Sequence, residues 1–243
     1  VIAKHPMDGV RYSKPVRAKD DIKFFTREEQ SKFLEAARKS HNYEQYALIL
    51  ETGLRTGELI GLTWDAIDFE HRMLTVNKTL EFRHAQQFWR AGPPKTQQSY
   101  RTIPLTDRAY DILKKLWDNR HERYESPALS ETLEYVDRRT GMMAKLVMRD
   151  LVFINWRTGQ PNKNSSYDTH LYKLCDKAGI KRVCMHALRY TYATRAIESG
   201  MPPKILQTLL GHASIKTTMD RYVHVTDESM NQAMIQFQQD AVY

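Results

Sequence analysis

The sequence predicts a mainly α-helical domain with one small antiparallel β-sheet, an α+β fold. Three observations support this class. The chain has 243 residues, of which 41% are hydrophobic, so it can bury the core of one large domain. Most apolar residues recur at helical intervals between capping residues and glycines. Only two longer segments, 73–80 and 99–105, are β-branched and alternating, as expected of strands.

The first helices are defined by their ends. Thr26 is followed three residues later by Glu29, the spacing of a capping box, and apolar residues then recur at helical intervals. A second helix is predicted over 43–52 and stops at Gly53. A tight turn after this glycine starts a third helix.

The two predicted strands are joined by a polar stretch. It contains the sequence 92–94, Gly-Pro-Pro, which suits the end of a hairpin. An amphipathic helix capped by Thr106 follows. The charged stretch 120–148 is expected to form helix plus loop, and 151–155 a short strand.

The second half of the chain is predicted to be helical. Three of its helices end at a glycine, the usual C-terminal signal. The predicted helices cover 164–179, 186–200, 202–211, 214–222 and, as a final amphipathic helix, 227–239.

Charge and composition indicate which class of partner the chain binds and the state of its cysteines. The net charge is +8 and the pI about 9.4, which favours a polyanionic partner through counterion release. The apolar runs are too short to cross a membrane, so a membrane is not expected among the partners. Cys175 and Cys184 form no metal-binding pattern and are expected to be reduced thiols, with a disulfide between them as the alternative.

Several polar residues stand where chemistry is possible. Arg55 lies in a glycine-flanked turn, and His186 and Arg189 share one face of a predicted helix. His212 follows a helix end, and Tyr222 lies ten residues further on among apolar neighbours. Each has an ordinary explanation alone: a surface arginine, a solvated pair, a helix cap or a core aromatic.

Taken together and in this order, the residues resemble the tyrosine recombinase family, the phage-type integrases. The matching stretches are TGLRTGELIGLTWDAID, PPKTQQSYRTIPL, HALRYTYAT and LLGHASIKTTMDRYVHV. The stretch SIKTTMDRYVHV and the predicted hairpin are most similar in sequence to integrases of conjugative transposons and temperate phages. The resemblance implies the fold of a DNA breaking-rejoining catalytic domain and assigns the active site to Arg55, Lys95, His186, Arg189, His212 and Tyr222.

The chemistry of DNA cleavage explains these residue types. Arg55 and Arg189 can grip the non-bridging oxygens of a phosphodiester and neutralise charge in the transition state. A tyrosine with a pKa near ~10 is a weak nucleophile at neutral pH and needs a base or a positive field. We expect Tyr222 to attack, with His186 as base or proton relay.

The remaining two residues complete the reaction. Lys95 is expected to protonate the leaving 5′ oxygen, and His212 to donate a hydrogen bond to the phosphate. The product is a 3′-phosphotyrosine, so rejoining needs no ATP, metal or other cofactor. Consistently, the sequence has no phosphate-binding glycine loop and no clustered metal ligands.

Some assignments stay open. Lys78 lies on the neighbouring strand and is the alternative acid if the hairpin register differs. Tyr190 and Tyr192 are rival nucleophiles, although both lie on a stiff helix. Many members carry an acidic residue where Ala187 stands and a histidine in place of Tyr190. Glu58 orients Arg55 or simply begins a helix.

The resemblance also implies organisation and partners. Residues 1–20 are expected to be a linker from an absent DNA-clamping domain, 21–225 the catalytic domain, and 226–243 a tail helix that docks in a neighbouring subunit or on its own core. The partners are double-stranded DNA, three further copies in a tetramer on two DNA sites, and an accessory directionality factor. A bacterial cytoplasmic, nucleoid-associated protein is expected. The basic hairpin is expected to contact the DNA backbone through Lys78, Arg83, Arg90 and Lys95.

Two other functions use the same features. A type IB topoisomerase-like enzyme would rejoin the same strand with the same residues. A non-catalytic DNA-binding accessory factor would have lost an arginine, histidine or tyrosine of the site, and none is lost here.

Overall fold

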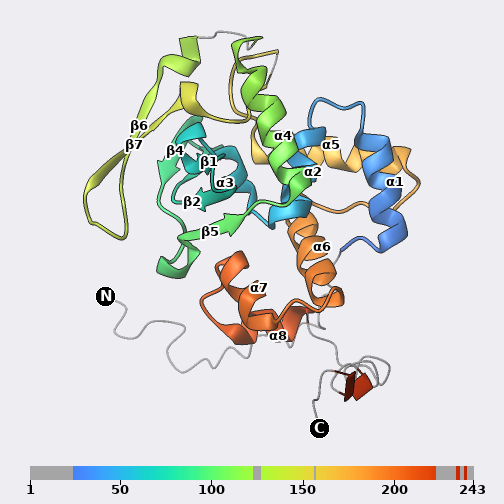
Figure 1. Ribbon diagram of the computed structural model, residues 1–243. Coiled ribbons are helices and arrows are strands. Elements are labelled where there is room, and N and C mark those ends of the chain that lie inside the picture. The colour runs from blue at the N-terminus through green and yellow to red at the C-terminus, as the bar shows by residue number, and fades with distance from the viewer. Residues whose placement is uncertain (1–23, 123–126, 156, 223–233, 236–237, 240–243) are drawn as a thin grey trace, which may run out of the picture.

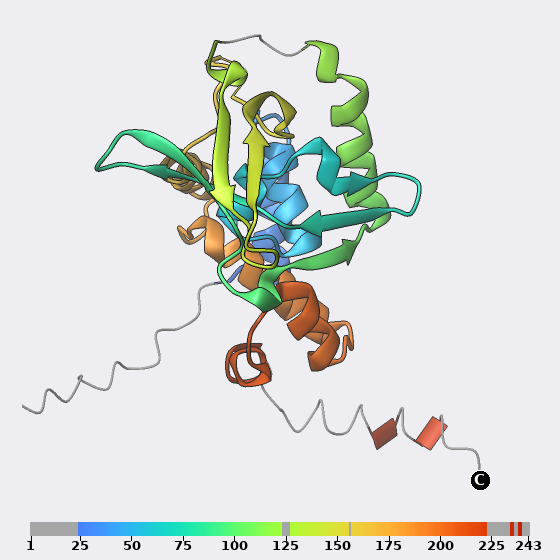
Figure 2. The ribbon, with the colours of Figure 1, turned by 90° about the vertical axis from the view of Figure 1, so that its left-hand side faces the viewer.

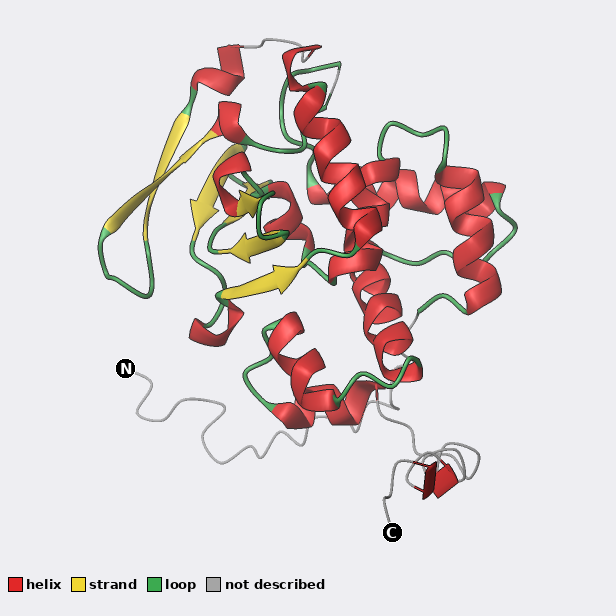
Figure 3. Cartoon of the chain, in the orientation of Figure 1, coloured by secondary structure: helices red, strands yellow, loops and turns green. Residues whose placement is uncertain are grey.

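The computed structural model describes residues 24–122, 127–155, 157–222, 234–235 and 238–239. Helices and strands alternate irregularly along this part of the chain (Figures 1 and 3). In order, they are α1 Arg27–Ala37, α2 Tyr43–Thr52, α3 Thr56–Ile60, β1 Ile67–Asp68, β2 Met73–Val76, β3 Thr79–Arg83, β4 Phe88–Gly92, β5 Arg101–Pro104, α4 Asp107–Asp118, β6 Thr132–Val136, β7 Met143–Val147, α5 Asn164–Lys177, α6 Met185–Glu198, α7 Pro203–Leu210 and α8 Ile215–Tyr222.

The helices form where their ends were predicted. Thr26 accepts the Glu29 amide at 3.1 Å, and the Glu29 carboxylate accepts the Thr26 amide at 2.8 Å, so the capping box is confirmed. Gly53, after α2, has φ +64°, the left-handed conformation that favours glycine. The helices together build one main core, and α2 packs against α6 at its centre (Figure 1).

The predicted fold class, mainly helical with antiparallel β-structure, is confirmed, but the described strands form three sheets in place of one. In the described residues, β1, β2 and β5 form a three-stranded antiparallel sheet, whereas β3–β4 and β6–β7 are separate two-stranded hairpins. The predicted strand 73–80 breaks at Asn77–Lys78, and the hairpin turns at 84–87, not at 92–94. Figure 2 shows β3–β4 projecting from the body of the molecule.

Two further predictions of local structure are corrected. The stretch 120–148 contains the β6–β7 hairpin, where Glu134 and Lys145 pair across the strands at 3.2 Å, in place of a helix plus loop. Residues 151–155 form no regular strand, because Leu151 makes only one isolated bridge to Thr63. Most of the predicted helix 227–239 lies outside the described residues.

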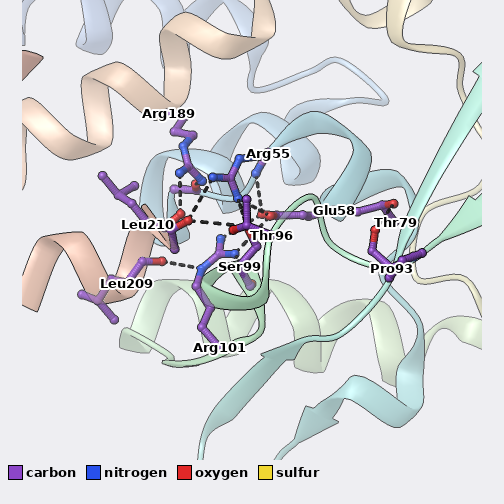
Figure 4. Close-up of polar contacts among 12 residues, drawn as sticks. Arg55, Glu58, Thr79, Pro93, Thr96, Ser99, Arg101, Arg189, Leu209 and Leu210 are labelled. Carbon is purple, nitrogen blue, oxygen red and sulfur yellow. Dashed lines mark hydrogen bonds and ion pairs between the residues drawn. The ribbon is translucent and has the colours of Figure 1, made fainter. Parts of the chain in front are cut away.

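The C-terminal helices form a small second cluster. Leu206 and Leu210 of α7 pack with Ala193 and Ala196 of α6, and α8 packs against both helices. This arrangement brings the end of α7 next to the turn that begins α3 (Figure 4). Of the helices described, every one is too short or too polar to cross a lipid bilayer.

Candidate active site

A cleft of about 870 Å³ collects three of the predicted active-site residues. Arg55 lies on its wall at the start of α3, Lys95 between β4 and β5, and His186 in the first turn of α6. They lie far apart in the sequence, and the fold brings them together on this cleft.

The cleft is also basic, as a DNA-binding surface must be. Glu58 and Glu81 are engaged by arginines, and Asp168 accepts the Met185 amide at 2.7 Å. The cations that line the cleft are Arg55, Arg83, Arg90, Lys95 and Arg138, and the carboxylates are Glu58, Glu81 and Asp168.

Arg55 is held by Glu58 and remains partly open to the cleft. Its Nη1 donates to Glu58 Oε1 at 2.7 Å, and its Nη2 donates to the carbonyl of Gly211 at 3.2 Å. The Arg55 side chain is nevertheless 27% exposed. Glu58 Oε2 also accepts the Arg55 backbone amide at 2.9 Å, so this carboxylate both contacts the Arg55 side chain and caps the start of α3, and the structure contains both alternatives left open by the sequence.

Glu58 is almost completely buried among positive groups. Burial alone would raise the pKa of Glu58, but the charge and hydrogen bonds of Arg101, with the charges of Arg189 and Arg55, lower it to about 2. The carboxylate is thus ionised at any physiological pH and holds its arginines firmly.

Arg189 lies deeper than expected. Only 1% of the residue is exposed, and its guanidinium donates to the carbonyls of Gly53 and Leu210. In this arrangement Arg189 bridges the ends of α2 and α7, and its groups are already engaged (Figure 4). Because Arg189 is buried, a phosphate can reach it only if the groups that cover it move.

The two histidines belong to different segments, His186 to α6 and His212 to the turn after α7. His186 is exposed on the cleft, with its ring edge-to-face on Tyr190 at 4.6 Å between centroids. His212 directly follows Gly211, whose carbonyl bonds Arg55, and its Nδ1 is 2.9 Å from Thr218 Oγ1 of α8. The Thr218 contact ties His212 to the helix that ends at Tyr222.

Tyr222 is the last residue of α8, but its side chain lies outside the described part of the structure. The rival tyrosines are both engaged by neighbours. Tyr190 packs on His186, and Tyr192 packs so closely on Gly53 that an added Cβ there would lie 2.5 Å from its ring. Burial raises the pKa of Tyr192, which makes it a poorer nucleophile.

The two candidate acids differ in their surroundings. Lys95 is exposed on the cleft. Lys78 is only 8% exposed, and its ammonium contacts Thr63 Oγ1 at 2.7 Å and the Asp65 carboxylate at 2.9 Å. The exposed DNA-facing position predicted for Lys78 is therefore not what the structure contains, because its charge is paired inside the domain.

The other predicted DNA contacts lie on the β3–β4 hairpin. Arg90 is exposed, and Arg83 is partly exposed and paired with Glu81 at 3.2 Å. Both face the cleft from paired strands. The hairpin also touches the start of α5, where Lys163 Nζ lies 3.6 Å from the centre of the Phe82 ring.

Arg101 was not among the predicted site residues. It lies on β5, is buried, and donates from both terminal nitrogens to Glu58, at 3.0 and 2.8 Å. A signal was present: Arg101 alternates with Ile103 on the inward face of a predicted strand, and a buried charge needs a partner.

Comparison with known proteins shows the family of the chain. The profile of the phage integrase family matches residues 23–229, most of the chain. The chain belongs to this family. The expected tyrosine recombinase fold is confirmed by the solved structures of family members described next.

Two relatives and two solved structures illustrate the match. The transposase from transposon Tn916 of Enterococcus faecalis is 30% identical over 214 residues, 84% of this chain and 48% of the relative. A XerC-like tyrosine recombinase of Caldanaerobacter subterraneus subsp. tengcongensis is 28% identical, over 96% of this chain and 59% of the relative. The chain thus spans about half the length of the curated relatives it matches.

The solved structures include members bound to DNA. The Tn1549 transposon integrase in complex with circular intermediate DNA has a TM-score of 0.70 at 26% identity, over 89% of this chain and 67% of that one. The XerA recombinase, at 22% identity over 91% of this chain and 66% of that one, shares the fold with a TM-score of 0.62.

Proposed function

We propose that this chain is the catalytic part of a site-specific recombinase, an integrase of a mobile element. It cuts and rejoins DNA strands through a 3′-phosphotyrosine. The observation that carries the proposal is the basic cleft shared by Arg55, Lys95 and His186, with α8 leading from His212 to Tyr222 beside it. The relatives named transposase, integrase and recombinase support the same activity.

The residues divide the reaction among them. Arg55 binds a non-bridging phosphate oxygen, and Arg189 joins it when its carbonyl partners exchange. The Tyr222 hydroxyl attacks phosphorus, its proton passes to His186, and the 5′ oxygen leaves with a proton from Lys95. His212 donates a hydrogen bond to the phosphate. The reverse reaction with another strand restores the phosphodiester.

The assembly is also proposed. Four copies act on two DNA duplexes, and an accessory factor sets direction. The tail 226–243 docks in a neighbouring subunit. Residues 1–20 link to a DNA-clamping domain, and residues 21–225 form the catalytic domain. The protein acts in the cytoplasm of a bacterium, at the nucleoid. The β3–β4 hairpin follows the DNA backbone through Arg83 and Arg90, with Lys95 nearby.

Strand exchange tests the function directly. Two duplexes with different labels, taken from the junction of the encoding element and its target, are incubated with the full-length protein. Recombinant strands that join the two labels are expected. Relaxation of a supercoiled circle without joined labels would identify a topoisomerase-like enzyme, and DNA binding without either product would identify an accessory factor.

A substrate with sulfur in place of the leaving 5′ oxygen decides between the two lysines. A thiol has a pKa near ~8.5 and leaves without protonation, so the variant that lacks the true acid regains cleavage on it. We expect Lys95→Ala to be rescued and Lys78→Ala not. Rescue of Lys78→Ala alone would assign the acid to Lys78, which would then have to leave Asp65.

A further inference from the structure

Arg101 is a buried arginine to which the proposed reaction assigns no task. All of its polar contacts are internal: Nε donates to the carbonyl of Leu209 at 2.5 Å, and Nη1 to the carbonyl of Ser99 at 3.0 Å. The two terminal nitrogens together hold both oxygens of Glu58 (Figure 4). Its side chain is 2% exposed, so no phosphate can reach it.

These contacts join three segments that carry the active site. Glu58 belongs to α3, which begins just after Arg55. Ser99 closes the short turn that follows Lys95, where Thr96 Oγ1 lies 2.9 Å from Ser99 Oγ. Leu209 lies in the last turn of α7, three residues before His212. One guanidinium therefore contacts the segments that carry Arg55, Lys95 and His212.

The same segments are in close contact at Gly211. A Cβ added there would lie 2.9 Å from Ser99 Cα and 3.2 Å from Arg101 Cδ. The Gly211 carbonyl in turn accepts from Arg55 Nη2 at 3.2 Å. A shift of Arg101 would therefore be transmitted to Arg55 and to the segment that follows Lys95, because the packing leaves no free space.

The charges make the position of Arg55 depend on Arg101. Three arginines surround the Glu58 carboxylate: Arg55 from the start of α3, Arg101 from β5 and Arg189 from α6. Lys78 lines a small cavity on its other side. Arg101 holds both carboxylate oxygens, so the single oxygen bonded to Arg55 Nη1 has a fixed place.

We propose that Arg101 is a positioning residue for DNA cleavage, which sets the Arg55 guanidinium for the scissile phosphate by clamping Glu58 and the end of α7. The inference rests on the proposed function. Because Arg101 touches no DNA, its loss should slow cleavage without weakening binding. Misplacement of a reacting group by about 1 Å costs on the order of 100-fold in rate, and we expect a loss of this size.

The test compares Arg101→Met with a matched control. Arg182 also makes a two-bond pair with a carboxylate, at 2.7 Å to each oxygen of Asp176, but it is exposed, in the loop between α5 and α6. Cleavage of a nicked duplex, carrying the sequence recovered from the wild-type covalent complex, is measured for both variants. DNA affinity is measured by titration of the same duplex. Arg182→Met should match wild type in both.

The pH profile separates positioning from general damage. Without Arg101, the largest of the effects that lower the pKa of Glu58 is lost, and this pKa rises from about 2. As the pH falls, Glu58 then takes up a proton and loosens Arg55. Arg101→Met should therefore lose additional activity towards acid pH, relative to wild type. The double variant Glu58→Gln/Arg101→Met should be slow without this added loss.

The double variant also guards against misfolding. Removal of one partner leaves a buried charge, whereas removal of both is often tolerated. If Arg101→Met fails to fold, the double variant is still expected to fold, to bind DNA and to cleave it about 100-fold more slowly than wild type. Cleavage at the wild-type rate by either variant, or parallel loss of binding and cleavage, would overturn the inference. Absence of cleavage by the wild type would instead refute the proposed function.

Discussion

A substitution at Gly211 should change both the stability of the domain and the geometry of the active site. It ends α7 at φ +62°, and its Cα faces the backbone of the segment before β5. An alanine there would place Cβ 2.9 Å from Ser99 Cα and 3.0 Å from the carbonyl oxygen of Gln98. Both neighbours are backbone atoms, so the clash cannot be relieved by turning a side chain.

Gly179 provides a matched control. It also follows a helix, at φ +64°, but nothing lies within 4 Å of its added Cβ. Alanine at either glycine incurs the left-handed backbone cost of about 1–2 kcal/mol. Each variant also gains the same ~0.4–1 kcal/mol from a stiffer unfolded chain. These terms cancel in the comparison, and the clash remains.

Overpacking of a well-packed site typically costs about 1–3 kcal/mol. Gly211→Ala should therefore be less stable than Gly179→Ala by that amount in urea unfolding. For a domain of this size, each kcal/mol corresponds to roughly 2–4 °C, so its Tm should be lower by roughly 2–12 °C. Cleavage should also fall in Gly211→Ala alone, because Arg101 and Ser99 must shift. Equal stabilities for the two variants would refute this reasoning.

Three further predictions concern other parts of the domain. Arg189→Lys should lose cleavage by about 100-fold or more, because a lysine lacks the planar, forked donors with which arginine grips a phosphate; rates on a nicked duplex measure this. His170 has a pKa lowered by burial, then by His41 and Lys173, so the unfolded chain takes up its proton first. Stability should be complete above pH 6.5 and fall as the pH drops below it, and His170→Gln should flatten that slope in urea unfolding. Thr26→Ala should cost about 1 kcal/mol by loss of the capping box, in the same assay, without slower cleavage.

Helices could be predicted because their signals are local. The capping box at Thr26 and the glycines after α5, α6 and α7 lie within a few residues of the ends they define. The candidate active-site residues were predicted from the resemblance to the recombinase family, and the fold places Arg55, Lys95 and His186 on one cleft. The prediction depended on the residue types and their order along the sequence.

The hairpins could not be predicted in the same way. The turn at 84–87 has no glycine, and Gln87 adopts φ +56° without the residue that usually signals it. The Gly-Pro-Pro at 92–94 has stronger turn residues but lies at the end of β4. Pairing across strands decided the register, and this depends on tertiary packing.

Long-range ion pairs were also out of reach. Glu58 and Arg101 are 43 residues apart, and no local pattern joins them. The burial of Lys78 on Asp65 and of Arg189 on two carbonyls likewise depends on chain segments that meet only in the fold. Inward-facing charges on predicted strands and helices mark such positions, but their partners become visible only in three dimensions.

The central claim is that Tyr222 attacks a DNA phosphodiester. The full-length protein is mixed with pooled DNA fragments of its own genetic element, including nicked duplexes that trap the intermediate. Protein that stays attached to DNA after denaturation is digested, and the modified peptide is mapped. The account predicts a nucleotide on Tyr222 and no adduct in Tyr222→Phe. A nucleotide on Tyr190 or Tyr192, or no covalent species at all, would contradict it.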